Sequence, residues 1–178
     1  MSAASLALLA LAGCYTADSV VMKFRKTDGR FIPAGLANPD KWMFQGRRDT
    51  PGKELRMTWI KPSASDPHQW TEMFEYQSIA RPAVTPQQYL DTFKELAVAK
   101  CPDSTLTPIE MGDHEVLFEL KSRGCPHVSN QDEIQRLLFG AHHLFNIAYT
   151  VNAREMTSEQ RKMGIAAVSA CDLMQTTL

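Results

Sequence analysis

The 178-residue sequence has no apolar run of about 20 residues, the length that a membrane-spanning helix requires. It contains no CxxC pair, no glycine-rich phosphate-binding loop and no G-x-S-x-G turn around a nucleophilic serine. It also lacks a basic excess, because 19 Lys and Arg stand against 20 Asp and Glu, a net charge of −1. That balance argues against nucleic-acid binding, which usually needs a basic stripe. These absences predict a protein with no catalytic residue and no cofactor.

One short apolar run is present at the start, where residues 6–12 consist only of Leu and Ala. Its length is typical of the apolar region of a secretory signal. The sequence "LAGC" at residues 11–14 resembles the bacterial lipobox. This resemblance implies a diacylglyceryl group on the Cys14 sulfur, cleavage before Cys14 and acylation of the new amino terminus. Two or more acyl chains hold a protein stably at a membrane, so the expected partner of Cys14 is the lipid bilayer.

The match departs from the signal pattern in one respect, since the first basic residue is Lys23 rather than one near the start. Either the start is truncated or the initiator lies upstream. The alternative is a buried Ala/Leu helix that opens a cytosolic domain. We expect a signal peptide at 1–13, a lipidated N-terminus, tether and first strand at 14–41, and one α+β domain at 42–178. Tyr15 in place of Asp resembles the sorting pattern for the outer membrane, facing the periplasm.

Three further cysteines remain for an exported, oxidising setting, where paired cysteines usually form disulfides. Cys101 and Cys125 occur in matching contexts, "KCPDS" and "GCPHV", each at the end of a predicted element and each before Pro. We predict that they pair, and closing that loop adds roughly 3 kcal/mol through the unfolded state. Cys171 is then a small buried hydrophobe on the last helix. Pairing of Cys171 with either of the others is the alternative.

Period-2 alternation predicts most of the body as strands, and two capped helices interrupt them. The first helix begins after Thr85, with Gln88 completing a capping box, and ends before Pro102. The second begins after Thr157 and extends to about Met174. The predicted strands cover residues 20–25, 53–62, 70–79, 104–111, 114–123, 134–139 and 144–153. The order ββ-α-ββββ-α predicts an α+β fold in which two helices pack a mostly antiparallel sheet.

At this level the layout resembles the PsbP-like α/β/α sandwiches of small exported and lumenal proteins. The stretch "WTEMFEYQ", followed by a capped helix that ends in "CP", is also similar to proteobacterial lipoproteins. The resemblance spans roughly residues 42–174. It implies a single-domain binding or assembly module and transfers no catalytic residue to this chain.

Several polar groups have the residue types of a site, but their spacing favours structural roles. His142 and His143 are adjacent, so on a strand they point to opposite faces, and only a loop would let them join His127 around a metal. "GDHE" at residues 112–115 falls at a predicted turn. Glu72 and Glu75 lie on opposite faces of one predicted strand, so they cannot pair with each other, although either can pair with a carboxylate elsewhere. We therefore predict no metal site.

The aromatic residues of the first half provide the most credible binding feature. Tryptophans buried in the sheet are the default expectation. If one or two are exposed beside a tyrosine, they form a patch for a protein or peptide partner. The residues concerned are Trp42, Trp59, Trp70 and Tyr76.

These observations together predict a non-catalytic cell-envelope lipoprotein that binds or supports a protein partner at the membrane. One alternative is a periplasmic immunity or inhibitor protein that neutralises a toxin, which predicts a tight heterodimer. The other is an envelope hydrolase acting on cell wall or lipid. A hydrolase requires a cleft with two carboxylates, or with His beside Ser or Asp, and strongly shifted pKa values.

Overall fold

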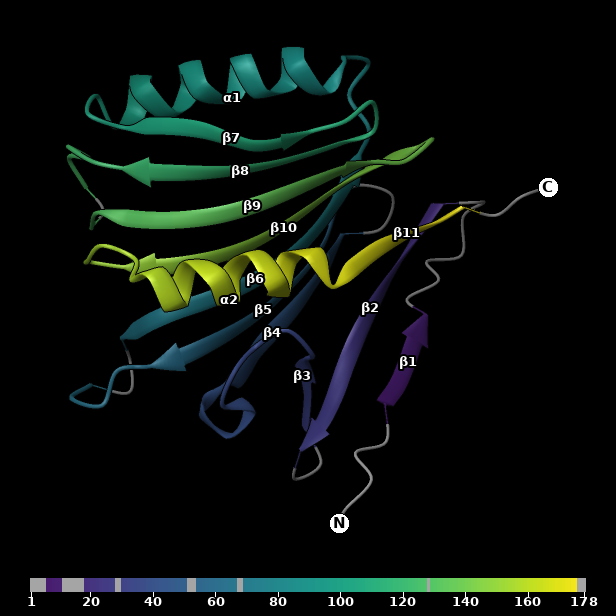
Figure 1. Ribbon diagram of the computed structural model, residues 1–178, viewed down its shortest axis with the longest axis vertical. Coiled ribbons are helices and arrows are strands. Elements are labelled where there is room, and N and C mark those ends of the chain that lie inside the picture. Colours follow the sequence, from purple (N-terminus) through teal and green to yellow (C-terminus); the bar gives the residue numbers. More distant parts are fainter. Residues whose placement is uncertain are drawn as a thin grey trace.

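The structure is a computed structural model that describes residues 6–10, 18–27, 30–50, 54–66, 69–127 and 129–175. A seven-stranded sheet and a four-stranded sheet pack with two α-helices, and all the described strand pairs are antiparallel (Figure 1). This is the α+β arrangement, with a mostly antiparallel sheet, that the sequence predicts.

The large sheet has the strand order β4-β5-β6-β10-β9-β8-β7. The predicted strands at 53–62 and 70–79 form the antiparallel pair β5–β6, in which Trp59 lies opposite Phe74. A tight turn joins β7 to β8, where the Gly112 amide donates to the Glu115 carbonyl at 2.9 Å. The strands are β4 (Met43–Thr50), β5 (Glu54–Pro62), β6 (Trp70–Ala80), β7 (Thr105–Met111), β8 (Glu115–Ser122), β9 (Gln131–Phe139) and β10 (His143–Asn152).

The small sheet is built around β2 (Asp18–Thr27). One edge of β2 pairs with β1 (Leu6–Ala10), and the other edge pairs with β3 (Arg30–Pro33) and β11 (Cys171–Gln175). The segment predicted to be the apolar part of a leader therefore forms an outer edge strand. Its removal from the mature chain stays a prediction, and β2 has strand partners on its other edge without it.

The first helix, α1 (Pro86–Lys100), has the predicted boundaries because its start is capped reciprocally. The Thr85 side chain accepts from the Gln88 amide at 3.2 Å, and the Gln88 side chain accepts from the Thr85 amide at 2.9 Å. Tyr89 and Phe93 then pack the helix against the sheet. Their ring centroids lie 5.8 Å from Phe139 and 5.5 Å from Phe118, so α1 covers the end of the sheet that β7 and β8 form.

The prediction of a second helix extending to Met174 was wrong, because α2 (Ser158–Ser169) ends five residues earlier and β11 follows at once (Figure 1). The cause is the free edge of β2 beyond β3, which offers backbone partners to residues 171–175. Cys171 lies opposite Met22, and its carbonyl accepts from the Arg136 guanidinium at 2.6 Å. Its thiol is free and 1 % exposed, and burial raises its pKa to about 12.

The structure has the predicted disulfide between Cys101 and Cys125, which ties the end of α1 to the loop after β8. We expect Cys101→Ser/Cys125→Ser to lower the free energy of unfolding by roughly 3 kcal/mol, because the cross-link restricts the unfolded chain. Urea unfolding with and without reductant measures this. Reduction should bring the wild type to the variant's stability and leave the variant unchanged; a wild type indifferent to reductant would contradict the prediction.

The described residues before Trp42 contribute to the main core rather than lying apart from it. Phe24 on β2 packs against Trp59 at a ring distance of 5.8 Å, and the loop residue Leu36 is 1 % exposed. A 3-10 helix at Pro39–Lys41, η1, leads into β4, a strand that the sequence analysis did not predict. The core therefore lies between the small sheet, α2 and one face of the large sheet.

The open face of the large sheet as a candidate functional site

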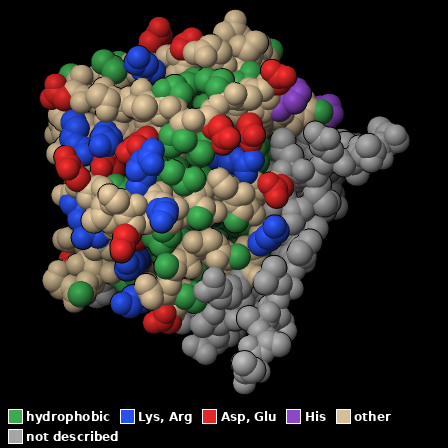
Figure 2. Space-filling model, viewed as in Figure 1, with side chains coloured by type: hydrophobic (Ala, Val, Ile, Leu, Met, Phe, Trp, Pro, Cys, Tyr) green, Lys and Arg blue, Asp and Glu red, His purple; other side chains and the backbone are tan. Residues whose placement is uncertain are grey.

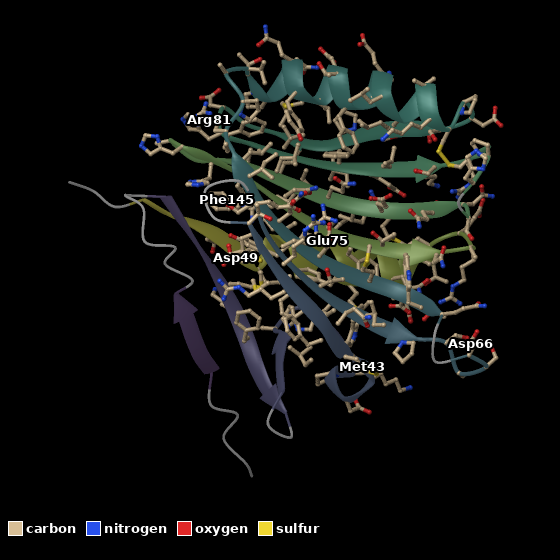
Figure 3. All side chains as sticks on the ribbon, turned by 180° about the vertical axis from the view of Figure 1, so that it is seen from behind. Met43, Asp49, Asp66, Glu75, Arg81 and Phe145 are labelled. Atoms are coloured by element: carbon tan, nitrogen blue, oxygen red, sulfur yellow. A yellow bond between two sulfur atoms is a disulfide. The ribbon has the colours of Figure 1, made fainter. Side chains whose placement is uncertain are left out.

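The two faces of the large sheet differ in how far they are covered. One face carries α2 and the small sheet and holds the main core. The outer surface of the molecule on this side carries both acidic and basic side chains, without a patch of one sign (Figure 2). On the opposite face α1 covers the strands β7 and β8, and its second core also takes in Leu137 and Phe139 of β9 and Leu144 of β10 (Figure 3). We call the part of this face that β4, β5, β6, β10 and β9 form outside that second core the open face.

Strand register arranges the side chains of the open face in rows, because successive residues point to opposite faces. The middle row runs from Glu75 through Ala148 to Gln135, and the row beside it includes Asn146. Figure 3 shows Glu75 near the centre of the sheet and Met43 at its lower margin. The margin is apolar and consists of Met43, Ile60 and Met73.

Glu75 and Glu133 are two carboxylates of the open face with perturbed ionisation. Burial removes the Glu133 carboxyl from water and is the main cause that raises its pKa, to about 7. A hydrogen bond from Gln135 lowers this pKa, and the nearby charges of Glu75 and Asp132 raise it. Desolvation also raises the pKa of Glu75, although the Arg56 charge and the Thr58 hydroxyl oppose it. The two carboxylates therefore interact electrostatically on a diagonal across β10, where Glu75 lies opposite Ala148 and Glu133 lies opposite Thr150.

The pKa of Glu133 makes the stability of the fold depend on pH. Its ordinary value is 4.5, so the folded chain retains a proton that the unfolded chain releases between 4.5 and about 7. Stability falls as pH rises through that range, and the loss is complete above it. We expect Glu133→Gln to be more stable than wild type at about pH 8 and equal to it at about pH 4, by urea unfolding. Glu110→Gln, on the exposed edge strand β7, is the control and should match wild type at both pH values; a Glu133→Gln variant that behaved in the same way would contradict the prediction.

Two amide side chains on the open face present carbonyl oxygens without hydrogen-bond partners. The Gln135 side chain is 4 % exposed, its Nε2 donates to Glu133 Oε2 at 2.5 Å, and its Oε1 has no partner. The Oδ1 of Asn146 is likewise buried without a partner. Buried polar groups are nearly always paired in folded proteins, so these two oxygens are exceptions on the open face.

Glu72 lies on the covered face, opposite in direction to Glu75, as the sequence predicts. Its carboxylate accepts from the Tyr149 hydroxyl at 2.6 Å and from Lys61 Nζ at 2.7 Å. Burial alone would raise the pKa of Glu72, but these hydrogen bonds and the Lys61 charge outweigh it and hold the pKa below its ordinary value. The carboxylate is therefore satisfied inside the fold.

The structure buries most of the aromatic residues named as a possible patch, which is the default expectation for the tryptophans. Trp42, Trp59 and Tyr76 are 1 %, 2 % and 3 % exposed and belong to the main core. Trp70, at the start of β6, is only half-buried. The reason is that the small sheet and η1 pack over the face from which these rings project, so they cannot form an exposed patch.

The histidines and the "GDHE" stretch lie at turns and strand ends. His142 is in the turn before β10, His143 begins that strand, and His127 lies in the loop after β8. The residues that the structure describes contain no group of three His, Cys, Asp or Glu side chains able to hold a metal ion. A shallow hollow of about 590 Å³ lies where α1 begins, lined by residues including Arg81, Asp113 and His142.

Cys14, the predicted lipidation site, lies outside the described residues. Among the described residues, no helix has both the length and the apolar composition needed to cross a membrane. The chain matches no family model, and no curated protein matches it.

The strand predicted at 134–139 begins after Glu133, whereas β9 begins at Gln131, so the acceptors of the open face were not predicted. A signal was present, since Glu133 and Gln135 flank Ile134 in the alternation of a strand. The sequence alone does not reveal that this polar side of β9 becomes buried, because the burial depends on neighbours from β8 and β10.

Proposed function

We propose that this chain is a cell-envelope lipoprotein, held through acylated Cys14, whose folded body is a non-catalytic module that binds a protein partner through the open face. The observation that carries the proposal is the unequal cover of the large sheet. One face is covered by α2 and the small sheet except at the β4 edge, where Phe44 is 49 % exposed, whereas the other keeps buried, unpartnered acceptors and Met43, which is 45 % exposed. A surface of this kind gains stability when a complementary partner covers it.

The N-terminal arrangement supports a removable leader. The described pairing of β1 is with β2 alone, and β2 retains β3 and β11 as partners. Cleavage before Cys14 would therefore take away one outer strand without opening the main core. We place the mature protein at the outer membrane facing the periplasm, on the lipobox resemblance and Tyr15. The order of strands and helices supports a PsbP-like sandwich as the fold type.

Membrane fractionation tests the anchor. Cys14→Ser should move the protein from the membrane fraction to the soluble fraction, because no acyl chain can be attached to serine in place of the thiol. Mass spectrometry of the wild type should find acyl chains on a terminal Cys14. Retention of the serine variant in membranes would count against the anchor.

A pull-down from envelope membranes tests the binding role. Wild-type acylated protein should capture a stoichiometric partner, and Met43→Arg should lose it, because Met43 is 45 % exposed and the change places a charge on the apolar margin of the open face. Glu110→Gln is the matched surface control. A capture that survives Met43→Arg would argue against the open face as the contact surface. A tight heterodimer with a toxin would instead favour the immunity-type alternative.

A hydrolase of cell wall or lipid is the second candidate, and one observation favours it. Glu75 and Glu133 interact, and the pKa of Glu133 is about 7, in the range of a general acid at neutral pH. Incubation with labelled peptidoglycan and with phospholipid vesicles tests this role. Turnover that Glu133→Gln abolishes would establish the enzyme, and absence of turnover would support the binding module.

A further inference from the structure

The acceptor cluster is a set of four side chains, Glu75, Glu133, Gln135 and Asn146, placed around Ala148 on the open face. Ala148 lies between Glu75 on one neighbouring strand and Gln135 on the other, and Asn146 is two residues along the same strand. Its methyl group is the smallest side chain at the centre of this arrangement. Polar side chains therefore surround the short side chain of Ala148.

The oxygen atoms of the cluster are hydrogen-bond acceptors, and few donors of the described chain lie close to them. Gln135 uses its amide nitrogen on Glu133 and leaves Oε1 unpartnered, and Asn146 Oδ1 is also unpartnered. The donors near Glu75 are distant, with the Thr58 hydroxyl at 3.4 Å and Arg56 Nη1 at 3.8 Å from Oε2. Arg56 Nε lies closer to Glu54, at 2.9 Å. The face holds one unpartnered donor of its own, the buried Arg56 Nε, but no described donor reaches Gln135 Oε1 or Asn146 Oδ1, so a ligand for these oxygens must bring donors.

We infer that the acceptor cluster binds an alkylammonium group, supplied either by a lysine side chain of the partner or by a free amine. The inference rests on the proposed function, in which the open face is the contact surface. An ammonium group has three donors and no acceptor, which complements amide and carboxylate oxygens arranged around one centre. A planar guanidinium instead favours one carboxylate approached side-on.

The apolar margin supports an ammonium on a hydrocarbon stem. Met73 precedes Glu75 by two residues on β6, and Ile60 lies opposite Met73 on β5. Met43, opposite Ile60, extends the margin to the edge strand β4. Lysine methylene groups pack along apolar surface while the charged end reaches a polar site. The margin therefore gives the stem a path from the edge of the sheet to the cluster.

Titration of the full-length Cys14→Ser chain followed by NMR tests the inference with four probes. They are n-butylammonium, tetramethylammonium, a short peptide with one central lysine, and that peptide with the lysine acetylated. We expect the first and third probes to shift the side-chain amide signals of Gln135 and Asn146. Tetramethylammonium has the charge without N–H donors, and acetylated lysine lacks the charge, so neither should do so.

The outcomes separate the two sources. A lysine peptide that binds more tightly than n-butylammonium identifies a partner's side chain, and equal affinity identifies a free amine. Binding of neither amine, or equal binding of tetramethylammonium, would overturn the inference. The experiment uses no membrane, so its failure is distinct from failure of the Cys14 anchor.

Variants locate the binding. Gln135→Met keeps the size of the side chain and removes the acceptor, so affinity for the lysine peptide should fall at least about tenfold. Ala148→Leu places a larger side chain at the centre of the cluster and should have a similar effect. Glu110→Gln, outside the cluster, should bind as wild type does. Thermal unfolding confirms that each variant is folded, and wild-type affinity in both cluster variants would overturn the inference.

Binding should also weaken as pH falls through about 7, because protonated Glu133 no longer attracts a cation. Other charged side chains lie near Glu133, and their effect on the pH dependence of binding must be separated from that of Glu133. Asp132 precedes it on β9, and the charged residues that share the described open face are Arg48, Glu54, Arg56 and Glu75. In Glu133→Gln the affinity should be lower at neutral pH and depend less on pH.

Discussion

Replacing Gly35 by alanine should lower the free energy of unfolding by about 3 kcal/mol or more, because the added methyl group meets backbone rather than a movable side chain. A Cβ at Gly35 would lie 2.4 Å from the Cα of Ala167 and 2.9 Å from its nitrogen. Both atoms belong to α2, which the sheet holds in place. The loop after β3 must then move away from the helix, and the buried side chain of Leu36 moves with it.

Gly46 provides the matched control, since a Cβ there would have no atom within 4 Å. Gly46→Ala should leave the free energy of unfolding unchanged or raise it by up to about 1 kcal/mol, because alanine restricts the unfolded chain more than glycine does. Urea unfolding of both variants at one pH measures the difference. Equal stabilities for the two variants would show that the loop and α2 are not in contact.

Local signals predict the helices and central strands well because their causes lie within a few residues. Thr85 and Gln88 satisfy each other's orphan backbone groups, so the start of α1 follows from four residues. The alternation around Trp59 likewise fixes which face of β5 is buried. These elements are confirmed because neighbours in sequence decide them.

The misplaced elements depend on pairing across the chain. Residues after Ser169 carry an apolar pattern compatible with a helix, but β2 supplies an edge that makes them a strand. β4 has mostly exposed side chains, including Arg47 and Arg48, so its sequence shows no alternation to detect. An edge strand with charges is protected from pairing with other chains, and its place is set by β5 alone.

The candidate site illustrates the same limit. The polarity of Glu133 and Gln135 is visible in the sequence, but their proximity to Glu75 requires β10 to separate β9 from β6. The tryptophans are a second case. Their burial is the default expectation, but the sequence does not show that the small sheet, whose strands come from both ends of the chain, covers Trp42 and Trp59.

Lys61→Met should lower the free energy of unfolding by about 3 kcal/mol at neutral pH, because it removes the nearest cation from a buried carboxylate. Glu72 is 2 % exposed, and its remaining cation, Arg154, is 3.8 Å away and itself exposed. Lys121→Met is the matched control. Lys121 is 46 % exposed and lies 3.9 Å from Glu119, so its loss should cost no more than about 1 kcal/mol.

The sign of the pH dependence separates charge from packing in the Lys61→Met variant. In wild type the pKa of Glu72 is lowered, so its contribution is present above the unfolded pKa and is lost as pH falls through the folded pKa. Without Lys61, burial dominates and raises that pKa, so the variant should gain stability relative to wild type on acidification. Adding Glu72→Gln should recover part of the loss at neutral pH, because a neutral amide oxygen still accepts from Tyr149. A double variant no more stable than Lys61→Met would assign the loss to the lysine stem rather than to its charge.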